Sequence, residues 1–177
     1  MPRPILNIDD VEFRNWGHNA GWPAGVNAQE DYQAKLGDIG RRLGAQKLGY
    51  NVTVIPANKR GFPLHSHRAN EEMFFILSGK GEFRIGSERH PVRAGDVICC
   101  PPGGPETAHQ IINTSDEELK FLAVSTRITP DISDYPESKK FGVFGEFTGP
   151  DGKPQMFRHL GRHENNIDYW DGEPEVK

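Results

Sequence analysis

Apolar and polar residues alternate in short runs through the middle of the chain. Each run is bounded by Gly, Pro, Asn or Asp, and alternation with a period of two is typical of strands with one buried face. The strand-like runs are 48–55, 73–77, 82–85, 89–92, 97–100, 109–112 and 119–126, and the alternation is clearest at 82–85. Short strands with tight turns and little helix predict an all-β fold, an antiparallel β-barrel or jelly roll.

The pattern divides the chain into three parts. Residues 1–45 form an N-terminal arm, in which 5–13 fits one short strand. Asn27 followed by Glu30 resembles a helix cap, so we predict a short helix over 28–36. Residues 46–128 form the barrel. Residues 129–177 form a C-terminal extension: a polar loop, a short strand at 141–144 and a tail that packs on the barrel or on a partner subunit.

Charge and composition exclude several partners. The chain has 21 basic and 25 acidic side chains and a net charge of −4, which offers neither a basic stripe for nucleic acid nor a polybasic patch for a membrane. The N-terminus lacks the apolar run of a signal peptide. The two cysteines, Cys99 and Cys100, are adjacent and cannot form a disulfide framework. We therefore expect a cytoplasmic protein with a small-molecule substrate.

Two histidines and a carboxylate stand close together in the sequence. His65 and His67 are two residues apart, so in an extended strand both side chains project from one face. Glu72 shares its strand face with the apolar Phe74, whereas Glu71 lies on the other face, so Glu72 is the carboxylate that points inward. Burying two imidazoles and a carboxylate without a cation carries a large desolvation cost, which predicts a metal site.

A fourth ligand has to come from another strand, and His109 at the start of the run 109–112 is the candidate. Three imidazoles and one carboxylate leave coordination positions open, as an exchange-labile catalytic centre requires. This donor set suits one divalent transition metal per chain, Zn, Mn, Fe, Ni or Co. The remaining histidines lack comparable neighbours and are His18, His90, His159 and His163.

The spacing of these residues resembles the two motifs of the cupin superfamily. The first motif is carried by Gly61, His65, His67, Glu72 and Gly79, and the second by Gly95, Asp96, Pro101, Gly103, His109 and Asn113. The resemblance implies a cupin-type jelly roll with an ion held by His65, His67, Glu72 and His109. The flanking segments 47–52 and 134–138 further resemble single-domain bacterial cupins that are labelled sugar-phosphate or mannose-6-phosphate isomerases.

Two gaps depart from the usual motifs without removing a ligand. The gap between Gly61 and His65 is shorter, and the loop 104–108 before His109 is longer. The longer loop places Glu106 where it could contact a substrate. Arg60 either meets an anionic substrate at the barrel mouth or is an ordinary solvated charge. Tyr50 either donates a hydrogen bond inside the barrel or fills the core.

The favoured function is that of a metal-dependent enzyme acting on a small polar metabolite. Isomerisation of a sugar or sugar phosphate, with Glu72 as the catalytic group, is the first choice. The alternatives are an Fe(II)-dependent dioxygenase, a lyase, a non-catalytic ligand-binding module, or a structural or storage role. An N-terminal arm and an aromatic tail around a small barrel also predict a homodimer.

Overall fold

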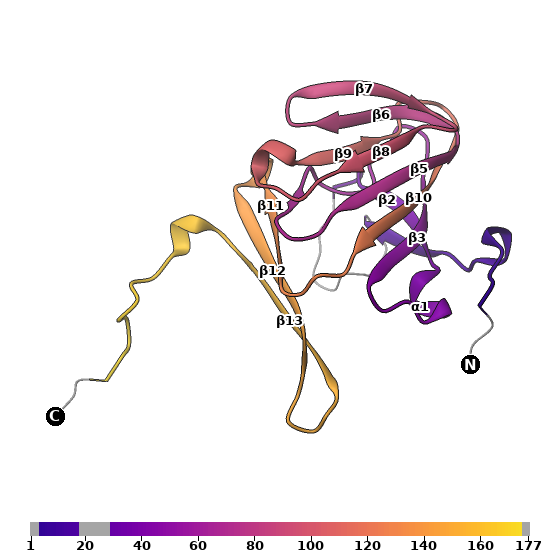
Figure 1. The fold of residues 1–177 in the computed structure, drawn as a ribbon. Coiled ribbons are helices and arrows are strands. Elements are labelled where there is room, and N and C mark those ends of the chain that lie inside the picture. The colour runs from indigo at the N-terminus through magenta and orange to yellow at the C-terminus, as the bar shows by residue number, and fades with distance from the viewer. Residues whose placement is uncertain (1–3, 18–28, 175–177) are drawn as a thin grey trace.

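The strands of this computed structural model form three antiparallel sheets (Figure 1). The structure describes residues 4–17 and 29–174. The largest sheet has the order β1 (Arg14–Gly17), β2 (Gln33–Asp38), β3 (Leu48–Ile55), β10 (Leu119–Thr126), β5 (Glu72–Ser78) and β8 (Val97–Cys100). The second contains β13 (Pro154–Gly161), β12 (Lys140–Thr148), β11 (Asp131–Tyr135) and β4 (Ser66–His67). The third contains β7 (Glu88–Arg93), β6 (Lys80–Ile85) and β9 (His109–Ile112).

Helix is scarce among the described residues. They contain one short α-helix, α1 (Gly40–Leu43), and the 3-10 turns η1 (Ile8–Asp10), η2 (Pro105–Thr107), η3 (Pro136–Ser138) and η4 (His163–Asn165). The fold is thus all-β and antiparallel, a cupin-type jelly roll whose strands divide among three sheets, and the predicted fold class is confirmed. No helix in the described part of the chain has the length and apolar character needed to cross a membrane.

Two apolar clusters lie on opposite faces of the largest sheet. The inner cluster fills the barrel and consists of Ile55, Phe74, Ile76, Phe83, Val92, Ile98, Cys100, Ile111, Leu119 and Phe121. The outer cluster packs the N-terminal arm and α1 on the sheet; its buried members are Val11, Ile39 and Val52, with Tyr50 packed against them. Alternation along β3 therefore sends Ile55 inward and Tyr50 and Val52 outward.

Residues 33–38 form a strand, so the helix predicted over 28–36 is wrong; Ala28 itself lies outside the described residues. β2 pairs with β3, and Ala34 and Leu36 are buried by that pairing. Contacts with a neighbouring strand thus override the weak local signal of a helix cap. The strand expected within 5–13 is likewise replaced by η1 and is followed by β1.

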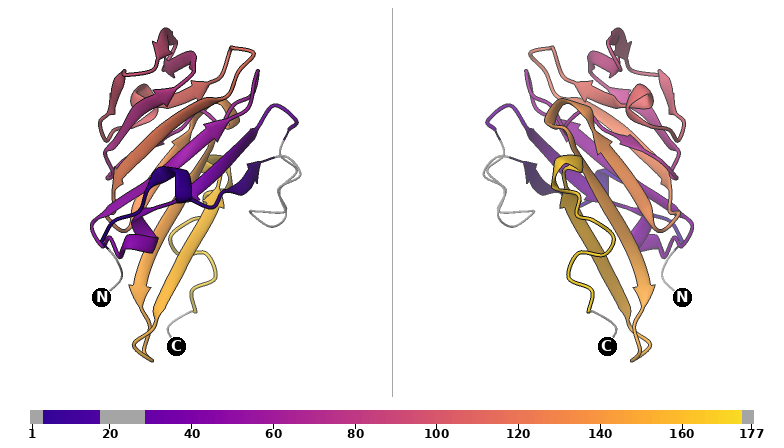
Figure 2. Two further views of the ribbon diagram at one scale, coloured as in Figure 1. Left: turned by 90° about the vertical axis from the view of Figure 1, so that its right-hand side faces the viewer. Right: turned by 90° about the vertical axis from the view of Figure 1, so that its left-hand side faces the viewer.

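The C-terminal extension contains three strands, more than the single short one expected at 141–144. β11 pairs with β4 in the barrel wall, while β12 and β13 form a long hairpin that extends beyond the other strands (Figures 1 and 2). No residue of β13 is buried, and residues 162–174 are all exposed. In Figure 1 the segment after β13 runs away from the barrel.

Candidate metal centre

Four side chains with metal-binding atoms meet at one end of the barrel. His67 belongs to β4, Glu72 begins β5 and His109 begins β9. His65 lies just before β4, and its backbone exchanges two hydrogen bonds with that of His109: His109 N donates to His65 O at 2.8 Å, and His65 N donates to His109 O at 3.2 Å. Residues far apart in the sequence are thus joined by strand-like pairing.

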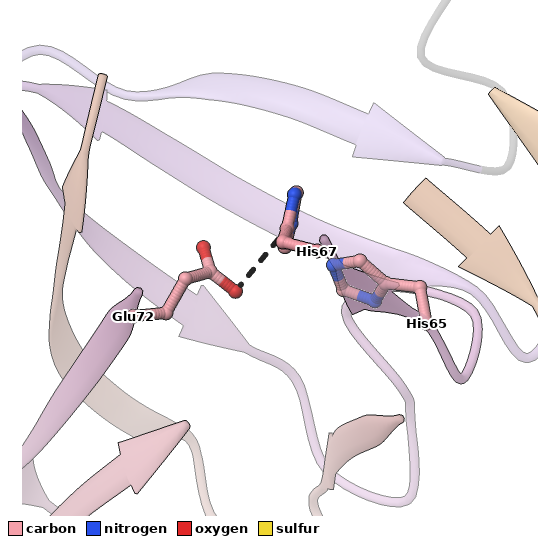
Figure 3. Close-up of side chains that lie close together, drawn as sticks. All are labelled: His65, His67 and Glu72. Carbon is pink, nitrogen blue, oxygen red and sulfur yellow. Dashed lines mark ion pairs between the residues drawn. The ribbon is translucent and has the colours of Figure 1, made fainter. Parts of the chain in front are cut away.

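The side chains converge on a small volume. One ligand atom from each of His65, His67 and Glu72 lies within 4.8 Å of the other two, and Figure 3 shows the carboxylate of Glu72 facing His67. Oε2 of Glu72 lies 3.6 Å from Nε2 of His67 and 3.0 Å from Nε2 of His109. Glu71, by contrast, is exposed and accepts a weak hydrogen bond from Cys99.

Each imidazole is held through its other ring nitrogen. Nδ1 of His65 lies 2.9 Å from the carbonyl oxygen of Pro63, and Nδ1 of His109 lies 3.2 Å from that of Thr107. Nδ1 of His67 lies 2.6 Å from Oδ2 of Asp131. Since carbonyl and carboxylate oxygens only accept, all three Nδ1 atoms carry hydrogen. In the neutral rings the lone pair is therefore on Nε2.

This donor set fits a divalent metal ion. Nε2 of His109 and Oε2 of Glu72 would both be acceptors at 3.0 Å, a distance that requires a proton or a cation between them. Hydrogen bonds from Nδ1 to a carbonyl or carboxylate are the arrangement that orients imidazole ligands in metal sites. The chemistry of the four side chains therefore supports the metal predicted from sequence.

The electrostatics favour the ligand forms of His65 and Glu72 at neutral pH. Burial lowers the pKa of His65 to about 4, so its ring is neutral. Burial alone would raise the pKa of Glu72, but the 3.0 Å contact with His109, which places a positive charge beside Oε2, and the other nearby imidazoles outweigh it and hold the pKa below its ordinary value. For His67, burial is outweighed by the contact with Asp131, which raises the pKa of the imidazole.

A cavity of about 120 Å³ adjoins the centre on the inner side of the barrel. Its lining residues are Asn51, Thr53, Ile55, Phe62, His65, Glu72, Phe74, His109, Gln110, Ile111, Phe121 and Ala123. The wall is mainly apolar, and no Lys or Arg contributes to this lining. Asn51 and Thr53 form one polar spot on β3, where Oγ1 of Thr53 donates to Oδ1 of Asn51 at 2.7 Å.

The three predicted substrate-binding residues lie outside this lining. Tyr50 packs in the outer cluster, on the opposite face of β3 from Asn51. The backbone of Arg60 bridges to Tyr32 and Ile112. Glu106 is exposed on η2, where its Oε1 accepts a hydrogen bond from the backbone N of Gly104. Main-chain hydrogen bonds hold the pKa of Glu106 below its ordinary value.

The other histidines within the described residues lie away from the centre. His90 is exposed beside Glu88, and the ring of His163 stacks on Phe141. His159 belongs to the exposed strand β13. His18 falls outside the described residues.

Four residues at the site were missed from sequence. Asn51 and Thr53 share the inward face of β3 with Ile55, so strand parity could have found them. Asp131 and Tyr135 belong to β11, and the ring of Tyr135 stacks on that of His65 with centroids 6.0 Å apart. Their only sequence signal was a polar segment that resembled a loop.

Residues 51–125 match a family model, that of the cupin domain. The resemblance to the cupin superfamily is thus confirmed over this segment. The matched segment runs from β3 to β10 and includes all four ligand candidates. The extension that carries Asp131 and Tyr135 follows it.

Two curated relatives each match less than half of the chain. An oxalate-binding protein of Thermotoga maritima is 41% identical over 78 residues, 44% of this chain and 60% of that protein. An uncharacterized protein of Methanocaldococcus jannaschii is 35% identical over 72 residues, 41% of this chain and 54% of that protein. The chain thus covers little more than half the length of these curated relatives.

Solved structures match nearly the whole chain. A sugar phosphate isomerase of the cupin superfamily from Silicibacter pomeroyi superposes with a TM-score of 0.73. The match covers 95% of this chain and 98% of that one, at 23% sequence identity. Identity this low shows a shared fold alone, and that fold includes the C-terminal extension as well as the cupin domain.

Proposed function

We propose that this protein is a metal-dependent enzyme that acts on a small polar metabolite, and that it isomerises a sugar or sugar phosphate. One observation carries the proposal. Ligand atoms of His65, His67 and Glu72 lie within 4.8 Å of one another, Nε2 of His109 lies 3.0 Å from Oε2 of Glu72, and the Nδ1 atom of each imidazole is held by an acceptor. Such a set orients a metal beside a small cavity.

His65, His67, Glu72 and His109 would hold one divalent transition metal ion per chain. Mixed nitrogen and oxygen donors suit Zn, Mn, Fe, Ni or Co. The ion would polarise a carbonyl or hydroxyl oxygen of the substrate. The side chains of the barrel would orient the substrate and exclude water from it.

Glu72 is the group to which we assign proton transfer. It is the only Asp or Glu that lines the cavity among the described residues, and its lowered pKa keeps it ionised at neutral pH. His67 and His109 both contact Oε2, so we assign the transfer to Oε1. Removing a proton from the carbon beside a carbonyl, returning it to the carbonyl carbon and moving the hydroxyl proton to the former carbonyl oxygen interconverts an aldose and a ketose without net proton release.

The cavity restricts which part of a substrate can enter. Its volume is about 120 Å³, below the roughly 300–1,000 Å³ of pockets that enclose a drug-sized ligand. A hydroxycarbonyl end fits, with Asn51 and Thr53 as polar contacts across from the ligands. No cationic side chain lines the space, so the phosphate of a sugar phosphate would lie outside it.

A second candidate is the binding of a small dicarboxylate. It is favoured by the cavity's small volume and by the 41% identity of the cupin domain to an oxalate-binding protein. Fe(II)-dependent dioxygenase, lyase and purely ligand-binding functions require the same metal ligands and differ in the metal and the substrate.

The decisive experiment identifies the metal and then the substrate. Protein purified without chelator is analysed for elements and then incubated with sugars, sugar phosphates, hydroxy acids, catechols and oxalate. We expect about one transition metal per chain and the interconversion of an aldose and a ketose. Oxygen uptake with bound Fe would point to a dioxygenase, and oxalate binding without turnover to the second candidate. Protein that takes up no transition metal would refute the proposal.

Single substitutions test the ligand assignment. His65→Ala and His109→Ala each remove an imidazole from the centre, so metal retention should fall to near zero. His163→Ala, on the exposed η4 turn, should retain the wild-type metal content. Equal loss in all three variants, measured by elemental analysis, would contradict the assignment.

We also propose that the protein is a cytoplasmic homodimer. Two free cysteines, one exposed and one buried, suit a reducing compartment. The exposed hairpin and tail of the C-terminal extension support a second copy as the partner.

A further inference from the structure

Asp131 holds one of the metal-ligand candidates from outside the cupin domain. Its Oδ2 lies 2.6 Å from Nδ1 of His67, and the residue is 5% exposed. Its other oxygen, Oδ1, accepts a hydrogen bond from the backbone N of Ala69 at 3.0 Å. Because both oxygens are engaged, the carboxylate is fixed in place and so fixes the plane of the imidazole.

The three imidazoles differ in what holds them. His65 and His109 each contact the carbonyl oxygen two residues earlier in the chain. These contacts belong to the backbone of the cupin domain itself. His67 depends on a side chain 64 residues away. A single substitution far away in the sequence, at Asp131, can therefore remove the contact that orients the ring of His67.

The pairing of β11 with β4 brings this side chain to the centre. Ser133 lies opposite His67 in the ladder, and Arg68 N donates to Ile132 O at 2.8 Å. Ser133 also places its Oγ 3.3 Å from Nδ1 of His67. Tyr135, at the end of the same strand, covers the ring of His65. One strand of the extension thus contacts two of the four ligand candidates.

We propose that Asp131 is the positioning residue of the metal centre, and that the cupin domain needs strand β11 to complete a tight site. Asp131 acts through His67: it orients the ring and keeps the hydrogen on Nδ1, so that Nε2 faces Glu72. This inference rests on the proposed metal site and adds to it a group that lies beyond the residues matched by the cupin family.

Asp134 provides a matched control on the same strand. It is also an aspartate with 5% exposure, but it accepts a hydrogen bond from Nε of Arg68 instead of from a metal ligand. Asp131→Asn and Asp134→Asn both exchange a buried carboxylate for an amide of the same shape. Only the first removes the charged acceptor from His67.

The test measures Zn²⁺ affinity by competition with a chelator and the visible spectrum of the Co²⁺-loaded protein. Asp131→Asn should bind Zn²⁺ about 10- to 100-fold more weakly and show an altered Co²⁺ spectrum. Asp134→Asn should match the wild type within about twofold. Equal Zn²⁺ affinity in wild type and Asp131→Asn would overturn the positioning role of Asp131 but not the metal site. Equal weakening of Zn²⁺ binding in Asp131→Asn and Asp134→Asn would do the same. Wild-type protein that binds neither ion would overturn the metal site and this inference together.

A measurement on the wild type covers the case in which Asp131→Asn does not fold. Nitrogen-15 NMR of the metal-free protein reports the hydrogen position on each imidazole. His67 should carry its hydrogen on Nδ1 in a strong hydrogen bond. A neutral His67 with hydrogen on Nε2 would overturn the assignment, because that nitrogen would then have no lone pair for a metal.

Discussion

Neighbouring residues on β3 face opposite sides of the sheet, and only one of them faces the cavity. Asn51 lines the cavity, whereas Tyr50 packs in the outer cluster. Oδ1 of Asn51 accepts from Thr53, which leaves the amide hydrogens of Asn51 to bind an oxygen of the substrate.

Asn51→Ala should therefore raise the KM for the identified substrate about five- to tenfold, as expected for the loss of one hydrogen bond. Metal content should not change. Tyr50→Phe, the control on the outer face, should leave KM within about twofold. Steady-state kinetics of the two variants show which face of β3 contacts the substrate. A larger rise in KM from Tyr50→Phe than from Asn51→Ala would contradict the assignment.

Acid should release the metal through protonation of the imidazoles. An imidazole binds a metal only when neutral, so retention should fall as the pH drops below about 6.5. The raised pKa of His67 means that it takes up a proton at a higher pH than an ordinary histidine. The pKa of His65, about 4, means that it takes up a proton at a lower pH than His67 does. Elemental analysis after dialysis across this range gives the curve, and constant retention down to pH 4 would argue against histidine ligation.

Strand alternation shows how much of the site can be predicted from residues alone. Parity of β5 separates Glu72 from Glu71, and the spacing of His65 and His67 brings two imidazoles together. Alternation along β3 places Asn51 on the inward face and Tyr50 on the outward face. The hydroxyl group of Tyr50 makes it a candidate by chemistry, but it lies on the face away from the cavity. The chemistry of a side chain therefore predicts poorly whether it lines a cavity, unless the strand face on which it lies is also known.

At the scale of elements, the strands from β3 to β10 follow from sequence because they are short apolar or alternating runs bounded by turn residues. β11 does not show this signal. Its buried residues include Asp131, Ser133 and Asp134, and two of them contact His67 and one contacts Arg68. Polar side chains in a buried strand are satisfied by partners far along the chain, which no local pattern reveals.

β13 escapes prediction for a different reason. None of its residues is buried, so neither face carries an apolar stripe that marks a strand. β2 shows a third case, in which pairing with β3 overrides a helix cap. What the sequence predicts well is the element that buries its own apolar face. The elements it predicts poorly are those determined by a neighbour.

The turn that ends β5 is a place where backbone geometry admits only glycine. Gly79 has φ of +84°, and a Cβ there would lie 2.4 Å from the carbonyl oxygen of Glu118. Gly95 has φ of +95°, but a Cβ there would meet nothing within 4 Å. Both substitutions incur the cost of a positive φ, and only Gly79 adds a clash with backbone.

Gly95→Ala should lower the free energy of unfolding by about 1–2 kcal/mol, the cost of left-handed backbone for an L-residue. Gly79→Ala should lower it by roughly 1–3 kcal/mol more, because the clash forces the neighbouring backbone to move. Urea unfolding measures both values. Equal losses of unfolding free energy in the two variants would show that the backbone of Glu118, close to residue 79, does not add to the cost of Gly79→Ala.

At the scale of the whole molecule, the C-terminal extension has two unlike halves. β11 packs into the barrel and contacts the metal-ligand candidates. The outer hairpin and the tail contact little of the barrel and expose large apolar side chains: Phe147, Met156, Phe157, Leu160, Ile167, Tyr169 and Trp170. A two-stranded hairpin with both faces in water is marginally stable, and an exposed strand edge favours pairing with another chain.

A second copy of the chain is the partner that we expect to cover this surface. The full chain should sediment as a dimer at micromolar concentration. Phe157 and Trp170 are 52% and 71% exposed, and Phe157→Ser combined with Trp170→Ser should shift the protein to monomer by removing two of the largest apolar contacts. Val97, 68% exposed on β8, provides the control, and Val97→Ser should leave the dimer intact. A wild-type chain that sediments as a monomer would contradict the assembly, whereas dissociation by Val97→Ser alone would move the interface to the barrel.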